Sequence, residues 1–333
     1  MKFIIYNVRD DEIPFVEKWG RDHHVEVVTT TTTLNTETVN EAQGFDGVSC
    51  LQTIPYTKEL FEAFHRMGIR YLALRNVGVD NIDRAAAKAN DVTITNVPAY
   101  SPESIAEFAV MMALYLTRKV GYMRQQLQDQ HEFHFSPEFM GRLISEQTVG
   151  IIGTGRIGRA AIHLFHGLGA KVIAYDKYPQ KSTNGEFTYV DRLETLLNQS
   201  DIISLHMPAT SDNHHLFNHE VFEEMKANAI LINTARGSIV NTNDLIFALE
   251  SGEIAAAGID TLENESADLQ DSRSTKKVAD AELIKLSVMP NVLVTPHSAF
   301  HTTESVKNMV NISLNNLKAM VMGEKPANLI DEN

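Results

Sequence analysis

Short apolar runs alternate with amphipathic stretches through the first hundred residues of the chain. The runs have the length of strands, whereas the stretches between them, such as KELFEAFHRMG (58–68), have helical spacing. Strand and helix in alternation favour a parallel α/β sheet. The five predicted strands are KFIIYNV (2–8), HVEVVTT (24–30), GFDGVSCL (44–51), IRYLALRNVG (69–78) and DVTITNVP (91–98).

A different pattern begins at Ser101, where Pro102 and Ser104 are helix-start signals before a long apolar run to residue 127. The pattern predicts a long helix that crosses between domains. A second, more strongly patterned sheet is expected after it, and a terminal helix over 302–323 has to pack on one of the two sheets. The strands predicted for the second sheet lie within 148–158, 170–176, 201–208, 229–235, 255–260 and 291–297.

Length and composition are those of a two-domain globular protein. The chain has 333 residues, 43% of them hydrophobic, and a formal net charge of -14. An acidic chain without a basic stripe repels polyanions, so nucleic acid is not an expected partner. The single cysteine, Cys50, excludes an internal disulfide, and neither a signal peptide nor a membrane-spanning run is evident, so a cytoplasmic location is expected.

A glycine motif marks the expected cofactor site. Gly153, Gly155 and Gly158 follow the apolar strand VGII, and a helical pattern comes directly after them. These glycines suit a tight turn, a close approach of backbone to a pyrophosphate, and close helix–strand packing. Asp176 ends the next strand, where a carboxylate binds ribose hydroxyls and repels a 2′-phosphate. The motif therefore predicts a dinucleotide site that prefers NAD to NADP, rather than a mere strand–helix turn.

Polar residues follow the later strands of the second sheet, at the carboxyl edge where open α/β sheets bind ligands. Arg236 can clamp a carboxylate and polarise a carbonyl, His297 can donate a proton, and Glu265 can keep that histidine protonated. Singly, each fits a solvated or structural role better. Together, beyond a dinucleotide motif, they predict reduction of a 2-keto acid.

The chain resembles the D-2-hydroxyacid dehydrogenase family, most closely its D-lactate dehydrogenase members. The resemblance implies two Rossmann-like parallel-sheet domains, one flavodoxin-like and one dinucleotide-binding, separated by a cleft. The matching segments cover nearly the whole chain: 75–83, 94–107, 149–158, 205–210, 232–240, 258–265 and 289–300.

The resemblance also implies particular roles for single residues. Arg236 binds the substrate carboxylate and keto oxygen, His297 is the general acid and base with Glu265 as its partner, and Asp260 tunes the pH dependence near the nicotinamide. The backbone N–H groups of Val77 and Gly78 meet the substrate carboxylate. Tyr100 and Phe300 enclose the substrate, although interdomain packing explains them equally well. The other cofactor contacts implied are Arg156, Ile157, Met207, Pro208, Asn213, Thr234 and Ala235.

The domains implied are residues 1–100 with 300–333 for the substrate, and 101–299 for NAD, in a chain that forms a homodimer through the helix near Ser101. Leu51 stands where some lactate-type relatives carry an aromatic residue, so longer 2-keto acids of the D-2-hydroxyisocaproate type compete with pyruvate as substrate.

Two other functions and a metal site fit the sequence less well. A phosphoglycerate enzyme would bring more cations and often a regulatory domain, and an NAD-sensing corepressor-type scaffold would carry disordered tails. No metal is expected, since the histidine pairs at 131 and 134 and at 163 and 166 lack completing ligands.

Overall fold

The computed structural model describes residues 1–79, 81–180, 185–263, 265 and 280–330. The chain divides into two compact units, the first formed by Met1–Ser101 with His301–Asn333 and the second by Pro102–Phe300. Among the described residues, no helix combines the length and apolar character that crossing a membrane requires.

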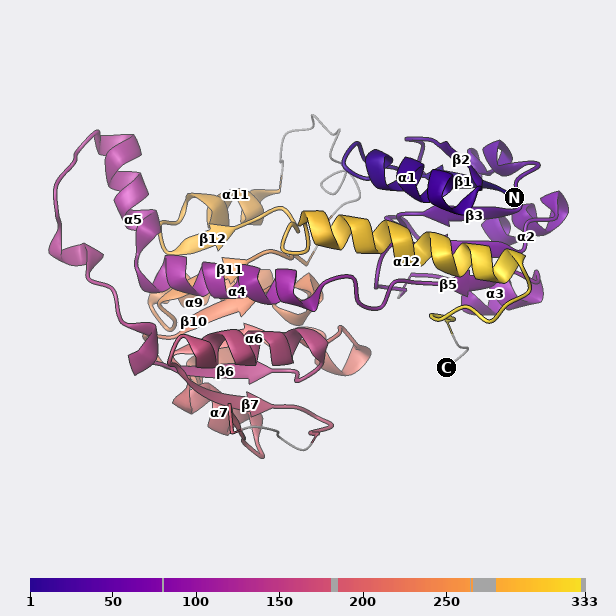
Figure 1. Cartoon of the computed structure of the whole chain (residues 1–333). Helices are drawn as coiled ribbons and strands as arrows, with labels where there is room; N and C mark the ends of the chain where they lie inside the picture. The colour runs from indigo at the N-terminus through magenta and orange to yellow at the C-terminus, as the bar shows by residue number, and fades with distance from the viewer. Residues whose placement is uncertain (80, 181–184, 264, 266–279, 331–333) are drawn as a thin grey trace. The chain divides into compact units, whose positions relative to one another are not determined.

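The first unit is a five-stranded parallel sheet in the order β2-β1-β3-β4-β5, which is the flavodoxin-like order (Figure 1). All five strands predicted from the first hundred residues are confirmed. The elements are β1 (Lys2–Tyr6), α1 (Ile13–His23), β2 (Glu26–Thr29), η1 (Val39–Ala42), β3 (Gly47–Cys50), α2 (Lys58–Met67), β4 (Tyr71–Leu74), α3 (Arg84–Ala89), β5 (Thr93–Thr95) and α12 (Thr303–Val321).

Helices cover both faces of this sheet. On one face α1 and the terminal helix α12 bury Trp19, Val310 and Leu314 against Phe3 and Ile5. On the other face, α2 and α3 supply a second apolar cluster. The terminal helix expected over 302–323 therefore exists, and it packs on the sheet of the first unit.

The second unit is a seven-stranded parallel sheet in the order β12-β11-β10-β9-β6-β7-β8. Its strand order reverses between β6 and β9, the switch point at which doubly wound sheets bind dinucleotides. The strands are β6 (Thr148–Ile152), β7 (Lys171–Tyr175), β8 (Thr188–Tyr189), β9 (Ile202–Leu205), β10 (Ile230–Asn233), β11 (Ala256–Ile259) and β12 (Val292–Val294).

Helices cover this second sheet as well, with α4 and α6 packed on one face and α7, α8, α9 and α11 on the other. The predicted α/β fold class is thus confirmed for both sheets. The helical segments are α4 (Pro102–Thr117), α5 (Val120–Gln125), η2 (Gln126–Gln130), η3 (Pro137–Phe139), η4 (Ile144–Glu146), α6 (Arg156–Gly167), α7 (Leu193–Gln199), η5 (Ser211–Asn213), α8 (His219–Glu223), η6 (Gly237–Ile239), α9 (Thr242–Ser251) and α11 (Ala281–Val288).

Two details differ from the sequence-based expectations. The helix expected to run unbroken from Ser101 to residue 127 stops at Thr117, because Lys119 adopts a left-handed backbone with φ 53° before α5 begins. The strand β8 was not predicted, since two residues at the sheet edge are too short for a periodic pattern. The charged segment 263–282, which its composition predicts to be a surface excursion, lies mostly outside the described residues.

Candidate active site

The carboxyl ends of β10, β11 and β12 bring the predicted catalytic residues onto one edge of the second sheet. Arg236 follows β10 and Asp260 comes directly after β11, while His297 follows β12 by three residues. The parallel register places these ends side by side, because Asn233 is opposite Ile259 and Ile259 is opposite Val294. Topology therefore assembles what the chain keeps far apart in sequence.

His297 and Glu265 form the central pair of this edge. Nδ1 of His297 lies 2.6 Å from Oε2 of Glu265, and the two side chains are 34% and 15% exposed. Burial alone lowers the pKa of His297, but the hydrogen bond and negative charge of Glu265 outweigh it and raise the pKa above the usual value. Glu265 is held in turn by the N–H of Leu262, which donates to Oε1 at 2.6 Å. The pair is therefore built to carry a proton.

Asp260 holds the segment that carries His297. The hydroxyl of Thr295 donates to Oδ1 at 2.6 Å, and the backbone N–H groups of Ser298 and Ala299 donate to Oδ1 and Oδ2 at 2.9 and 3.0 Å. Between these anchors His297 has a φ of 50°, a left-handed conformation that is uncommon for a residue other than glycine. The 2%-exposed carboxylate thus fixes a strained backbone, a contact that the sequence did not predict.

Arg236 is set by the turn that follows β10. The side chain of Asn233 accepts the N–H of Ala235 at 3.0 Å and donates to the carbonyl of Arg236 at 3.0 Å. A Cβ on Gly237 would lie 1.9 Å from backbone atoms of Leu262, so this position requires glycine and the turn packs directly on the segment leading to Glu265. Arg236 itself is half-buried, and its positive charge lowers the pKa of His297, which places the two cations in electrostatic reach.

Phe300 completes this edge, because its ring stands edge-on to the ring of His297 with centroids 6.5 Å apart.

Two residues of this site, Asn233 and Thr295, were not predicted from the sequence. An asparagine two residues before a backbone N–H that it can accept is a common turn signal, and it could have identified Asn233. The contact between Thr295 and Asp260 spans two strands and carries no local signal.

The glycine motif has the geometry that a pyrophosphate requires. Gly153 has a φ of 93°, and a Cβ on Gly158 would lie 1.9 Å from the carbonyl oxygen of Gly153. A Cβ on Gly155, by contrast, would meet no atom within 4 Å, so the backbone there is open on the side where α6 begins. Exposed Arg156 and half-buried Ile157 form the first turn of that helix. The backbone geometry of the glycine motif therefore fits the pyrophosphate of NAD.

Asp176 is fixed as a carboxylate beside the motif. Burial alone raises its pKa, but the backbone N–H groups of Thr154 and Tyr178 outweigh that effect and lower it. Thr154 donates to Oδ2 from its N–H at 2.6 Å and from its hydroxyl at 2.8 Å. The side chain stays ionised at neutral pH, as recognition of ribose hydroxyls requires.

The remaining predicted cofactor contacts follow β9 and β10. Asn213 donates to the carbonyl of Pro208 at 2.8 Å and accepts the N–H of Thr210 at 2.7 Å, so its amide closes the loop after Met207. Thr234 and its neighbour Ala235 are both buried. The hydroxyl of Thr234 has no hydrogen-bond partner among the described residues. An orphaned buried hydroxyl at this edge fits a bound ligand.

The residues predicted to face the substrate from the first unit lie at its carboxyl edge. Leu51 follows β3, Val77 and Gly78 follow β4, and Tyr100 follows β5. All four are half-buried. The carbonyl oxygen of Tyr100 accepts a hydrogen bond from the side chain of Asn308 at 2.8 Å.

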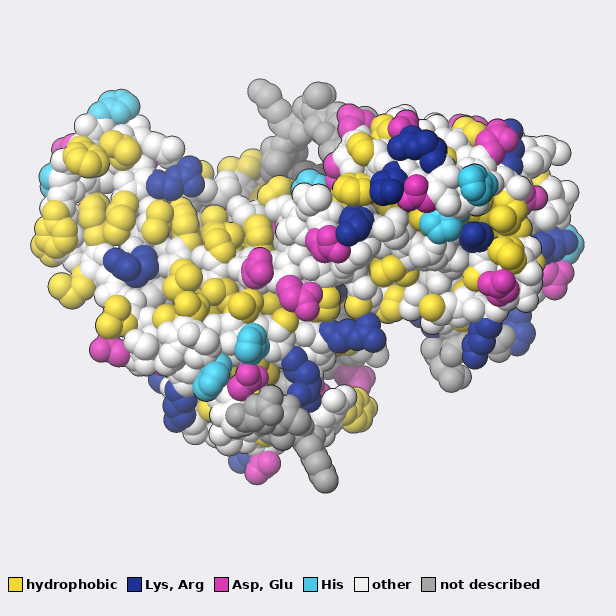
Figure 2. Space-filling view, viewed as in Figure 1, with side chains coloured by type: hydrophobic (Ala, Val, Ile, Leu, Met, Phe, Trp, Pro, Cys, Tyr) yellow, Lys and Arg dark blue, Asp and Glu magenta, His cyan; other side chains and the backbone are white. Residues whose placement is uncertain are grey.

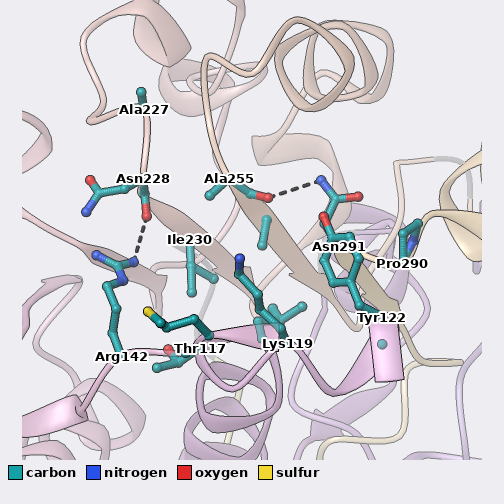
Figure 3. A pocket seen from close by; sticks show the side chains of 15 residues that line it. Thr117, Lys119, Tyr122, Arg142, Ala227, Asn228, Ile230, Ala255, Pro290 and Asn291 are labelled. Carbon is teal, nitrogen blue, oxygen red and sulfur yellow. Dashed lines mark hydrogen bonds between the residues drawn. The ribbon is translucent and has the colours of Figure 1, made fainter. Parts of the chain in front are cut away.

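A cavity of about 360 Å³ lies elsewhere, at the amino ends of β10 and β11 (Figure 3). Lys119 and Tyr122 line it, and Arg142 donates to the carbonyl of Asn228 at 2.8 Å. Because this is the sheet edge opposite to Arg236 and His297, the cavity is not the catalytic site.

One group of possible metal ligands occurs among the described residues. His214, His215 and Glu263 place one ligand atom each within 4.8 Å of one another. Nε2 of His215 is hydrogen-bonded to Oε1 of Glu263, a pairing that is complete without an ion. The sequence-based expectation that the chain binds no metal remains a prediction.

Comparisons with known proteins identify the family of the chain. The family described as D-isomer specific 2-hydroxyacid dehydrogenase, NAD binding domain, matches residues 110–299. A D-2-hydroxyacid dehydrogenase (NAD+) of Lacticaseibacillus paracasei is 45% identical over 95% of both chains, and a D-lactate dehydrogenase of Streptococcus agalactiae is 42% identical over 95% of both. A solved structure of D-2-hydroxyisocaproate dehydrogenase is 43% identical, covers 99% of each chain and has a TM-score of 0.92. The chain belongs to the D-isomer specific 2-hydroxyacid dehydrogenases, an NAD-binding family of enzymes.

Proposed function

We propose that the chain reduces 2-keto acids to D-2-hydroxy acids with NADH, with pyruvate as the first candidate substrate and D-lactate as its product. The observation that carries the proposal is the pair formed by His297 and Glu265 beside Arg236, at the carboxyl edge of the sheet that holds the dinucleotide motif.

His297 is the proton donor in this proposal. Its Nδ1 is engaged by Glu265, so delivery of a proton to the substrate oxygen falls to Nε2. The raised pKa favours the protonated ring, which is the form that reduction needs. In the oxidation direction the neutral ring accepts the hydroxyl proton, and Glu265 stabilises the imidazolium that results.

Arg236 holds the substrate. A guanidinium binds a carboxylate through two parallel hydrogen bonds and stays charged at every relevant pH. The N–H groups of Val77 and Gly78 are proposed to meet the same carboxylate. Tyr100 and Phe300 are proposed to exclude water from the substrate.

NAD supplies the oxidising or reducing equivalents when it is bound. Gly155, Arg156 and Ile157 are proposed to hold its pyrophosphate through the amino end of α6, and Asp176 its adenosine ribose. The adenosine is assigned to Met207, Pro208 and Asn213, and the nicotinamide half to Thr234, Ala235 and Asp260.

Leu51 favours a second candidate substrate class, the longer 2-keto acids. Its flexible aliphatic side chain leaves more room than an aromatic one, and one or two methylenes are worth about 1–3 kcal/mol in an apolar pocket. The likeness to a D-2-hydroxyisocaproate dehydrogenase supports the same class.

The test is NADH oxidation with pyruvate, 4-methyl-2-oxopentanoate and phenylpyruvate, followed by chiral analysis of the product. We expect turnover and a D-product, and the ratio of kcat/KM values identifies the preferred chain length. No turnover of any 2-keto acid, or an L-product, would refute the proposal.

We further infer a homodimer in the cytoplasm. Hydrophobic side chains gather over α4, α5 and the segment after them (Figure 2). Their exposure exceeds what a monomer usually leaves in water. The most exposed are Leu127 at 50%, Phe133 at 95%, Phe135 at 80%, Met140 at 72% and Leu143 at 60%. Light scattering should give twice the chain mass, and Phe133→Ser with Phe135→Ser should lower it.

A further inference from the structure

The loop after β4 has an unusual hydrogen-bond pattern, in which successive carbonyl oxygens are all engaged. The carbonyl of Asn76 accepts the N–H of Val97 at 3.2 Å. The carbonyl of Val77 accepts the side-chain amide of Asn96 at 2.7 Å, and that of Gly78 accepts the side-chain amide of Asn76 at 2.6 Å. Every donor belongs to the first unit.

The two donating amides are themselves fixed. Oδ1 of Asn76 accepts the N–H of Gln52 at 3.0 Å. Asn96 is held through its backbone, because its N–H donates to the carbonyl of Asn328 at 3.2 Å and its carbonyl accepts the side chain of Asn316 at 3.3 Å. Asn96 is therefore anchored to α12 and to the segment that follows this helix.

These contacts determine where the N–H groups of the loop point. In a planar trans peptide the carbonyl oxygen and the following N–H point in opposite directions. The bond from the Asn96 side chain to the Val77 carbonyl thus turns the N–H of Gly78 away from Asn96. In the same way, the bond from the N–H of Val97 to the Asn76 carbonyl turns the N–H of Val77 away from Val97. Within the described chain neither N–H donates a hydrogen bond. Successive N–H groups of this kind form an anion-binding concavity.

We propose that Asn96 is a positioning residue that aims the N–H of Gly78 at the substrate carboxylate. Asn76 holds the next peptide in the same way. This inference rests on the proposed function, since it gives these N–H groups a 2-keto acid to bind. It adds a residue that acts through backbone and has no contact of its own with substrate.

The test compares pyruvate with methyl pyruvate, an ester without the negative charge. The variant Asn96→Leu keeps the approximate shape of the side chain but cannot donate to the Val77 carbonyl. We expect the ratio of kcat/KM for pyruvate to that for methyl pyruvate to fall roughly tenfold or more, the size expected when hydrogen bonds to a charged group are weakened. KM for NADH should change less than about twofold, because the cofactor motif lies in the other unit.

The matched control is Asn90→Leu, because the side chain of Asn90 also donates to a backbone carbonyl, that of Ala86, at 2.9 Å. The control should leave the ratio unchanged. If Asn96→Leu does not fold, Asn96→Ala takes its place in the same measurement.

The outcomes separate the inference from the proposed function. An active Asn96 variant with an unchanged ratio, or with equal losses on both substrates, overturns the positioning role while the dehydrogenase proposal stands. Absence of turnover by the unaltered chain overturns the proposed function and this inference with it.

Discussion

Each unit keeps an ion pair at the carboxyl edge of its parallel sheet, and the two pairs differ in their surroundings. In the first unit Arg75, directly after β4, bonds Glu12 at 2.8 Å, and both side chains are fully buried. Arg75 also donates to the carbonyls of Tyr6 and Asn7, at 3.0 and 2.9 Å. In the second unit, His297 and Glu265 form a pair that is partly exposed.

The difference distinguishes charged residues that stabilise the fold from charged residues that take part in the reaction. A buried cation whose donors all end on protein groups fixes the chain and has nothing left for a ligand. A titratable group that is partly exposed can exchange a proton with a ligand. Two sheets of the same architecture thus place charge at the same edge for different purposes.

The largest expected effect is on chemistry, from His297→Ala. Loss of the proton donor should lower kcat for pyruvate reduction roughly 10²–10⁴-fold, with KM for NADH nearly unchanged. Steady-state kinetics measure both values. A large loss of NADH affinity with little change in kcat would assign His297 to cofactor binding.

Arg75→Met should act on stability. Removal of one partner leaves the Glu12 charge buried and uncompensated, which costs about 3–5 kcal/mol in the free energy of unfolding. Urea denaturation measures this, with Lys18→Met as the control because Lys18 and Asp22 form an exposed pair. A loss as small as that of the control would mean that the buried pair is not structural.

Asp260→Asn tests the clamp on the strained backbone of His297. The amide replaces one acceptor with a donor that faces the N–H groups of Ser298 and Ala299, so we expect kcat to fall roughly 10–100-fold. Thr295→Val removes a single hydrogen bond and should cost only about a few-fold. Equal effects of the two variants would contradict a clamp through the backbone.

The smallest effect, confined to one pH range, is expected from Glu265→Gln. Reduction needs protonated His297, so the rate falls as pH rises through the pKa of His297. Without the Glu265 carboxylate the raised pKa drops, and the decline should move to lower pH while rates in acid converge. A pH profile of kcat/KM measures the shift. An unchanged profile would mean that Glu265 does not raise the pKa of His297.

The sequence predicted what depends on local pattern or residue chemistry. The turn at Gly153 and the strands before Arg236 and His297 follow from glycine spacing and apolar runs, and all three lie where expected. The break at Lys119 was not predicted, since lysine carries no signal for a positive φ.

Contacts between distant segments were also beyond the sequence. The carboxylate of Asp260 meets Thr295 only because β11 pairs with β12, and Asn96 meets the carbonyl of Val77 only because β4 pairs with β5. Such partners depend on register, which no single run of residues encodes.

The first unit is built from two separate segments of the chain, and this has a consequence for folding during synthesis on the ribosome. Strands β1 to β5 emerge early, but α12 covers one face of their sheet, burying Leu314 and Leu317 and joining Ser313 to Ser49 at 3.0 Å. That face of the sheet stays exposed to water until the ribosome has translated all of Pro102–Phe300. The contiguous second unit therefore completes its core first, and the first unit closes only when its last helix arrives.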